Sequence, residues 1–290
     1  MTTTSTPAAP RDLTRLAYSG NIPDAATRAR RARRWGWWYM TEYQLRNMRR
    51  YGWPVLVYDV GQPLLYLLAM GLGLGAIVDA NSGAVDGVPY LVFVAPALAV
   101  STSVMTAASE TTYPVMSGFK WQRLYYAPAA TAVSPGQIAT GHRLAVSLRF
   151  IGQATVFWIL MSLLGATSGP ASLLLIPAAG LAALAFAAPL QAYSATLREE
   201  GFQFSFIQRF VVMPMFLFAG TFFELTTMPP YLQWIGWISP VWHGTELARA
   251  ATYGHALTGL TAAIHLGFLT ACVVVGHVWA RRNYRRRLGE

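Results

Sequence analysis

The sequence holds few charged residues, a single cysteine and a single lysine. Charged residues make up 12% of the 290 positions, whereas soluble domains carry about 25%. Cys272, standing alone, excludes a disulfide within the chain and any metal site built from several cysteines. Lys120 is followed by Trp121, so the chain lacks the Gly-Lys-Ser/Thr core of an ATP-binding P-loop. The composition therefore argues against a soluble domain and against ATP hydrolysis through a P-loop in this polypeptide.

Long apolar runs are what the sequence has in their place. Hydrophobic residues make up 54% of the chain, and a bilayer-spanning helix needs about 20 consecutive, mostly apolar residues. Six runs meet this requirement, and we predict membrane spans at Pro54–Val78, Tyr90–Ala108, Leu144–Gly165, Ala171–Ala195, Phe204–Phe223 and Thr258–Ala280. The expected fold class is an all-α integral membrane protein with six transmembrane helices.

Basic residues are concentrated on one side of this predicted topology. Ten arginines precede Pro54 and five more lie in residues 281–290, whereas the three loops on the opposite side contain only Arg249. Cytoplasmic flanks of membrane helices are enriched in Lys and Arg. We therefore expect a multi-pass protein of the cell (inner) membrane with both termini in the cytoplasm. The net charge of +10 then orients the spans, and no nucleic-acid partner is expected although the chain is basic.

The region before the first span divides into two parts. Residues 1–34 are rich in Ala, Thr, Pro and Arg and are expected to form a flexible basic tail. Residues 35–53 combine aromatic and basic side chains, which favour the headgroup level of a membrane. We predict an interfacial amphipathic helix here, carried by Trp37, Trp38, Tyr43, Arg46, Arg49 and Arg50. A simple basic anchor before the first span is the alternative. Residues 281–290 are expected to form a second basic cytoplasmic tail.

The stretch "TFFELTTMPPYLQWIGWISP" (Thr221–Pro240) is apolar but broken by prolines. It is too interrupted for a spanning helix, yet irregular backbone is tolerated at membrane depth where protein buries it. We predict that Glu224–Tyr253 forms two short helices that re-enter the outer leaflet between spans five and six; a flat amphipathic surface loop is the alternative. The residues predicted to cap the outer end of a pathway are Glu224, Pro229, Pro230, Trp234, Trp237, His243 and Glu246.

Three carboxylates at span ends are the remaining chemical signal. Asp59 lies about one turn into span one, Glu110 closes span two and Glu224 ends span five. Intramembrane charges often serve function, so a proton-coupled secondary transporter using these three residues stays open as an alternative. A structural role, with Asp59 pairing with an arginine at the same interface, is favoured. The five histidines show no metal-binding spacing, and we expect no catalytic, cofactor or metal residue in the chain.

Two segments carry a family likeness, Ala108–Leu144 and Met213–Gly254. The first holds Glu110–Tyr113, an aromatic-basic loop and then Pro128, Ser134–Pro135 and Gly141. The second holds "LFAGTFFE", Pro229–Pro230, "PVWH" at Pro240–His243 and Arg249. Together they resemble membrane (permease) subunits of ABC-2 type exporters, in the nodulation-factor (lipo-oligosaccharide) and daunorubicin-type branch. Two positions depart from the family pattern: His142 replaces an acidic residue and Glu224 replaces a proline.

The resemblance implies an ATP-driven exporter of an amphipathic cargo, such as a drug-like compound, a lipid or a lipid-linked saccharide. Residues 54–280 would form the ABC-2 type transmembrane domain. Two copies of a separate ATP-binding subunit would hold ATP and Mg, and a second membrane subunit, identical or different, would complete the assembly. Ser117–Gly141 would form the ATPase-coupling loop, with contacts at Phe119, Lys120, Trp121, Arg123, Tyr125 and Tyr126. For Ser117–Gly141, the alternative is a solvated cytoplasmic loop. For the chain as a whole, a further alternative is a membrane scaffold or enzyme that transports nothing.

Overall fold

The computed structural model describes residues 24–49 and 52–289, and all the regular elements in these residues are helices. The only extended pairing there is an isolated bridge between Val85 and Val88. Five helical stretches are long and apolar enough to cross a membrane: Gly52–Ser82, Tyr90–Phe119, Pro135–Leu163, Pro170–Ser194 and Gly259–Leu288. The all-α class and a multi-pass membrane architecture are therefore confirmed.

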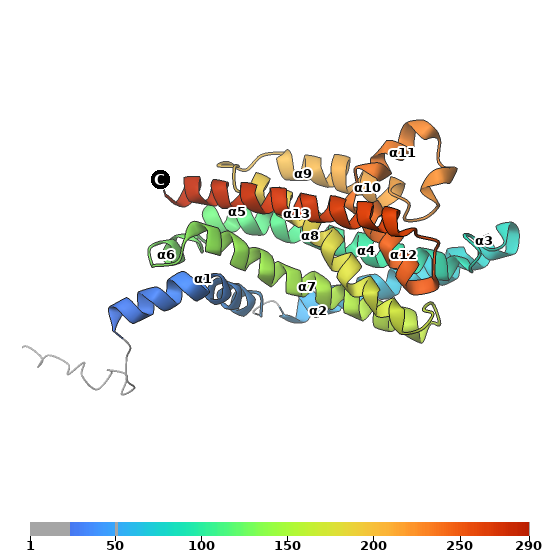
Figure 1. The fold of residues 1–290 in the computed structure, drawn as a ribbon, viewed down its shortest axis with the longest axis horizontal. Coiled ribbons are helices and arrows are strands. Elements are labelled where there is room, and N and C mark those ends of the chain that lie inside the picture. The colour runs from blue at the N-terminus through green and yellow to red at the C-terminus, as the bar shows by residue number, and fades with distance from the viewer. Residues whose placement is uncertain (1–23, 50–51, 290) are drawn as a thin grey trace, which may run out of the picture.

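The helices follow one another in a single bundle (Figure 1). The first half of the chain holds α1 (Ala25–Met48), α2 (Gly52–Tyr66), the π-helix η3 (Leu67–Leu74), α3 (Gly75–Ser82), α4 (Tyr90–Thr111), α5 (Tyr113–Phe119), α6 (Tyr126–Ala129) and α7 (Pro135–Leu163). The second half holds η4 (Pro170–Leu174), α8 (Leu175–Ser194), α9 (Gln203–Ile207), η5 (Gln208–Val212), α10 (Met213–Phe218), η6 (Leu225–Thr227), α11 (Pro230–Trp237), α12 (Pro240–Tyr253) and α13 (Gly259–Leu288).

Helix α4 forms the centre of the bundle. An apolar stretch of 18 residues in the span that contains α4 is 83% buried. The corresponding stretches of the first span and of α13 are 22% and 17% buried, so these two spans lie at the periphery. Small residues let the neighbouring helices approach closely, as is usual in membranes where no hydrophobic force drives helix association. A Cβ atom on Gly276 of α13 would lie 2.4 Å from the backbone nitrogen of Pro189 in α8. Close backbone contact of this kind fixes α8 between α4 and α13.

The fifth expected span is shorter than predicted. The helical stretch α9–η5–α10 runs from Gln203 to Phe218 and does not reach Phe223. At 1.5 Å per residue it is about 24 Å long, short of the roughly 30 Å hydrocarbon core. It ends because Ala219 leaves the helical conformation and Gly220 adopts a φ of 78°. The chain then turns back over the bundle through η6.

The two ends of the bundle carry different elements (Figure 1). Helices α1, α5 and α6 lie at one end with the C-terminal part of α13, and α3, α11 and α12 lie toward the other. Two short helices follow span five as predicted, with Pro229 capping α11 and a break at Ser239 before α12. The N-terminal helix and the C-terminal end of α13 share one end, which is the side that the charge distribution assigns to the cytoplasm.

Three boundaries differ from the sequence-based expectation. Helix α1 begins at Ala25, ten residues before the expected start, with the Asp24 carboxylate accepting from the Thr27 N–H. Helix α7 begins at Pro135 because Ser134 and Gln137 form a capping box. Helix α13 continues to Leu288, so most of the expected C-terminal tail is helical. Residues 1–23 of the expected flexible tail, and Arg50, lie outside the described residues.

Candidate functional site

The predicted ATPase-coupling loop divides into exposed and buried side chains. Trp121 is 47% exposed and Tyr126 is 36% exposed, and Lys120 and Arg123 are exposed as well. The Arg123 guanidinium stacks over the Tyr126 ring at 4.8 Å. The expected short helix of this loop is the single turn α6. Trp121, Lys120, Arg123 and Tyr126 thus form one exposed surface at the end of the bundle, which we call the coupling turn.

Phe119 and Tyr125, the two remaining residues predicted for this loop, are buried and anchor the coupling turn. Phe119 packs edge-on against Tyr125 and against Tyr284 of α13, with both centroid distances at 4.8 Å. The Tyr125 hydroxyl lies 3.0 Å from Nδ1 of His142, and His142 Nε2 lies 3.3 Å from the Glu110 carbonyl oxygen. Because a carbonyl only accepts, His142 donates from Nε2 and its Nδ1 accepts from Tyr125. The histidine that departs from the family pattern therefore links the turn to α4 and α7.

Helix α1 is held against the start of α7. The Gln137 amide donates to the Arg33 carbonyl at 2.7 Å. A Cβ atom on Gly141 would lie 2.6 Å from Met40 Cβ, so α1 lies very close to α7 there. Trp38 and Tyr43, two aromatic residues of this helix, are exposed. Of the other residues predicted for the interfacial helix, Trp37 is half-buried and Arg46 and Arg49 are exposed.

Asp59 and Glu110, two of the three carboxylates predicted at span ends, share one arginine. Arg149 of α7 contacts Asp59 of α2 with two hydrogen bonds, Nη2 to Oδ1 at 3.1 Å and Nε to Oδ2 at 3.2 Å. Its Nη1 forms an ion pair with the Glu110 carboxylate of α4. All three side chains are at most 17% exposed. This Asp59–Arg149–Glu110 triad joins three spans, and the predicted pairing of Asp59 with an arginine is present.

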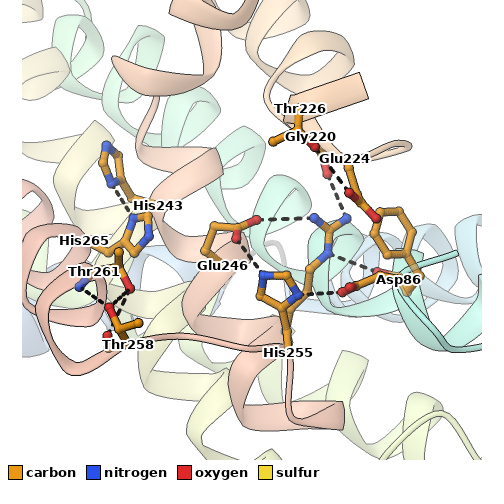
Figure 2. Close-up of polar contacts among 12 residues, drawn as sticks. Asp86, Gly220, Glu224, Thr226, His243, Glu246, His255, Thr258, Thr261 and His265 are labelled. Atoms are coloured by element: carbon orange, nitrogen blue, oxygen red, sulfur yellow. Dashed lines mark hydrogen bonds and ion pairs between the residues drawn. The ribbon is translucent and has the colours of Figure 1, made fainter. Parts of the chain in front are cut away.

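A second charged network surrounds His255 (Figure 2), toward the end of the bundle that carries α3 and α12 (Figure 1). His255, in the loop before α13, lies 2.5 Å from the Asp86 carboxylate through Nδ1 and 3.2 Å from the Glu246 carboxylate through Nε2. Arg249 also contacts Glu246, at 3.4 Å. The Tyr253 hydroxyl donates to Asp86 at 2.7 Å. This network, which we call the His255 cluster, ties the loop between the first two spans to α12 and to the start of α13.

Arg249 is the only basic residue in the three loops that are predicted to lie opposite the arginine-rich side. It is 1% exposed, stacks over the Phe93 ring at 3.8 Å and donates to the Gly220 carbonyl at 2.8 Å. A buried, paired arginine carries little information about membrane orientation, since the orienting bias concerns charges that flank spans. The only basic residue of the predicted outer loops is therefore a structural ion of the bundle.

The residues predicted to cap the outer end of a pathway do not all line the same cavity. Glu224 and Glu246 line a cavity of ≈ 220 Å³ together with Asp86, Trp237, Arg249 and His255. His243 lies apart, with Nδ1 2.7 Å from Nδ1 of His265 (Figure 2). Its Nε2 lies 3.0 Å from the Trp237 carbonyl oxygen. Trp234, Pro229 and Pro230 are exposed. The Glu224 carboxylate accepts a hydrogen bond from Thr226 at 3.3 Å. Among the described residues, no three potential ligands from His, Cys, Asp and Glu are arranged to hold a metal.

Stability should depend on pH through His255. Its hydrogen bond to Glu246, with that to Asp86, outweighs burial and raises the pKa of His255 from 6.5 to about 9. A raised pKa favours the folded state below pH 6.5, and this contribution disappears as the pH rises through about 9. We expect the melting temperature of the purified protein to fall across this interval. The His255→Gln variant should melt lower and show a flatter profile; an identical profile would contradict the assignment.

Several residues of these networks were not predicted from the sequence. Arg149, Asp86, His255 and Tyr284 lie far along the chain from their partners, and the sequence alone does not pair them. One local signal existed for Arg149, because it lies inside an apolar run, where a charge requires a partner. The sequence carried no comparable signal for Tyr284, whose neighbours "RRNYRRR" indicate an exposed tail.

Comparison with known proteins identifies the class to which this bundle belongs. The fold defines a multi-pass helical membrane protein, and residues 36–253 match the family described as ABC-2 type transporter. Nodulation protein J of Rhizobium leguminosarum bv. viciae is 30% identical over 231 residues, covering 79% of this chain and 86% of that protein. Nodulation protein J of Rhizobium meliloti (strain 1021) is 28% identical over 255 residues, covering 88% and 94%. The chain belongs to the ABC-2 type transporter family and is a membrane transport subunit; the predicted resemblance is confirmed.

Proposed function

We propose that this chain is the membrane subunit of an ATP-driven exporter that moves an amphipathic cargo out of the cytoplasm or the inner leaflet. Membership of the ABC-2 type transporter family carries this proposal. The likeness to nodulation protein J over most of both chains supports a lipid-linked saccharide as one cargo class; a drug-like compound or a lipid are the others. We infer from the distribution of basic residues that both termini lie in the cytoplasm, and we propose six spans in the inner membrane, with Gln203–Phe218 as the short fifth span.

Because this chain has no P-loop, separate subunits would have to bind ATP. Two ATP-binding subunits would hold ATP and Mg and contact the coupling turn, and a second membrane subunit, identical or different, would complete the pathway. Helices α11 and α12 would re-enter the outer leaflet and lid that pathway. The coupling turn suits a protein partner because aromatic and arginine side chains are enriched at interface hot spots. Helix α1, with its exposed aromatic face, would rest on the membrane and supply a second contact.

The coupling turn provides the direct test of the ATPase partnership. We expect Trp121→Ala to weaken binding of the proposed ATP-binding subunit by about 2 kcal/mol, a loss of about thirtyfold in Kd. The matched control is Trp53→Ala, since Trp53 is also exposed, at 74%, but lies outside the turn. Binding is measured by titrating the ATPase onto the membrane subunit in lipid nanodiscs. Equal affinity of both variants and the native chain would remove the turn from the interface, and a chain that exports without any ATPase would overturn the function.

A further inference from the structure

A cleft opens beside the short fifth span, and none of its lining residues belongs to the coupling turn or to the His255 cluster. It has a volume of ≈ 420 Å³ and lies between the end of α4 with the start of α5 on one side and α9 with η5 on the other. Its polar lining comes from Ser109, Thr112, Tyr113, Ser205, Gln208 and Arg209. None of these residues takes part in the networks described above.

Arg209 is an unusual residue for this position. It lies about 9 Å along the helix from Gln203, at 1.5 Å per residue, within an apolar stretch of span length. Its side chain is exposed, and it makes no ion pair with any residue of 24–49 or 52–289. A charge at membrane depth is costly and normally has a partner. The partner of Arg209 must therefore come from outside the described part of this chain.

The hydrogen-bonding groups around Arg209 indicate the sign of that partner. The side chains of Tyr113, Ser205 and Gln208 donate no hydrogen bond to another described residue, so their donors are available to a ligand. The hydroxyls of Ser109 and Thr112 differ, because they donate to the carbonyls of Met105 and Ala108, each at 3.0 Å. One guanidinium and three neutral donors match an anion that accepts several hydrogen bonds, and Arg binds phosphate and carboxylate in this way.

An aromatic ladder lies on the same helical stretch as Arg209. Phe202, Phe206 and Phe210 are 75%, 50% and 65% exposed. Successive ring centroids lie 6.5 Å and 4.9 Å apart, so the rings form one continuous surface. At the other wall, Tyr113 packs edge-on against Phe204 at 4.9 Å. The π-helical turn η5, which carries Gln208 and Arg209, is a type of distortion frequent at functional sites. The polar cleft thus lies next to an exposed aromatic surface, a combination that fits an amphiphile whose head group is bound at Arg209.

We propose that this cleft binds the anionic head group, a phosphate or a carboxylate, of an amphiphile standing in the cytoplasmic leaflet, with Arg209 as its counter-ion. The head group belongs either to a bilayer phospholipid or to a transported compound, and the chemistry of recognition is the same. The site goes beyond the proposed export function. Its test needs neither the cargo nor the ATPase, so failure of one proposal leaves the other standing.

The test uses the full chain in phosphatidylcholine nanodiscs and radiolabelled dodecyl phosphate as the probe. Dodecyl maltoside serves as the uncharged competitor with the same alkyl chain. We expect saturable binding, a loss of about tenfold or more in affinity for Arg209→Gln, as for removal of a charge-assisted hydrogen bond, and near-native affinity for Arg209→Lys. The matched control is Arg282→Gln, which removes an exposed arginine on α13. Because Arg209 is itself exposed, the variants should fold, and size-exclusion profiles check this.

A second arm separates the two sources of the head group. Nanodiscs that also contain phosphatidylglycerol will compete with the probe if the site takes a bilayer phospholipid. Probe binding will be unchanged if the site is reserved for another anionic amphiphile; both results support an anionic site. The proposal is overturned if Arg209→Gln binds the probe as well as the native chain, if Arg282→Gln loses as much affinity, or if dodecyl maltoside displaces the probe as readily as unlabelled dodecyl phosphate.

Discussion

Replacing Arg149 by methionine is expected to lower the free energy of unfolding by about 3–5 kcal/mol, the cost of breaking a buried ion pair by removing one partner. The substitution leaves the carboxylates of Asp59 and Glu110 facing one another without a counter-ion, and all three side chains are at most 17% exposed. The three spans that meet at the triad, α2, α4 and α7, lose their shared contact. This is the largest stability effect that we expect of any single substitution in the chain.

The matched variant removes the whole triad at once. Asp59→Asn, Glu110→Gln and Arg149→Met together leave no unpaired charge, and replacing a complete buried ion network is often neutral or stabilising. We therefore expect the triple variant to regain most of the stability that Arg149→Met loses. Both are measured by denaturant titration of the purified protein in mixed micelles. If Arg149→Met were as stable as the native chain, the triad would carry no structural role.

The same triple variant addresses the proton-coupled alternative. That reading requires Asp59, Glu110 or Glu224 to carry protons, yet the first two are held by Arg149. Glu224 lies in the turn that precedes α11, toward the opposite end of the bundle (Figure 1). We expect export by the triple variant with Glu224→Gln added to continue in the presence of ATP. Export that follows the proton gradient in the native chain and stops in this variant would favour the secondary transporter instead.

Local sequence patterns were enough for the helical framework. Apolar run length predicted five spans that the structure contains, and prolines predicted the start of α11 and the break before α12. The errors lie at boundaries where polar residues continue a helix beyond the apolar run. The Ser134-x-x-Gln137 pattern of a capping box is present in the sequence and indicates a helix that begins at Pro135, where α7 starts. The arginine-rich end of α13 is helical, and its Tyr284 packs against Phe119, which anchors the coupling turn.

Site geometry was less predictable because it depends on pairing across the bundle. Asp59 and Arg149 are 90 positions apart, and Asp86 and His255 are 169 apart. Composition identifies each as a polar residue near a span end, but helix packing selects its partner. The burial of Phe119 and Tyr125 shows the same limit. Their aromatic character indicated an exposed contact surface, whereas the structure uses them to hold that surface in place.

The substitution Tyr125→Phe is expected to weaken the coupling of ATP hydrolysis to export by about fivefold or more, the lower end of typical coupling free energies. The phenylalanine keeps the packing against Phe119 and Tyr284 but removes the hydroxyl that donates to His142. His142 in turn contacts the Glu110 carbonyl at the end of α4. The hydrogen-bonded path from the coupling turn to the central helix is thereby broken, while the exposed contacts for the ATPase remain.

The measurement compares cargo-stimulated ATPase activity with transport in reconstituted vesicles. Basal ATPase activity and binding of the ATP-binding subunit should be unchanged, because Trp121, Lys120 and Arg123 are intact. Tyr126→Phe is the matched control, since it also removes one tyrosine hydroxyl but from an exposed ring. A loss of protein or of complex in Tyr125→Phe would instead indicate a purely structural role. If transport per ATP stayed the same in Tyr125→Phe and Tyr126→Phe, coupling would have to pass through other contacts of this surface with the spans, such as that of Phe119 with α13.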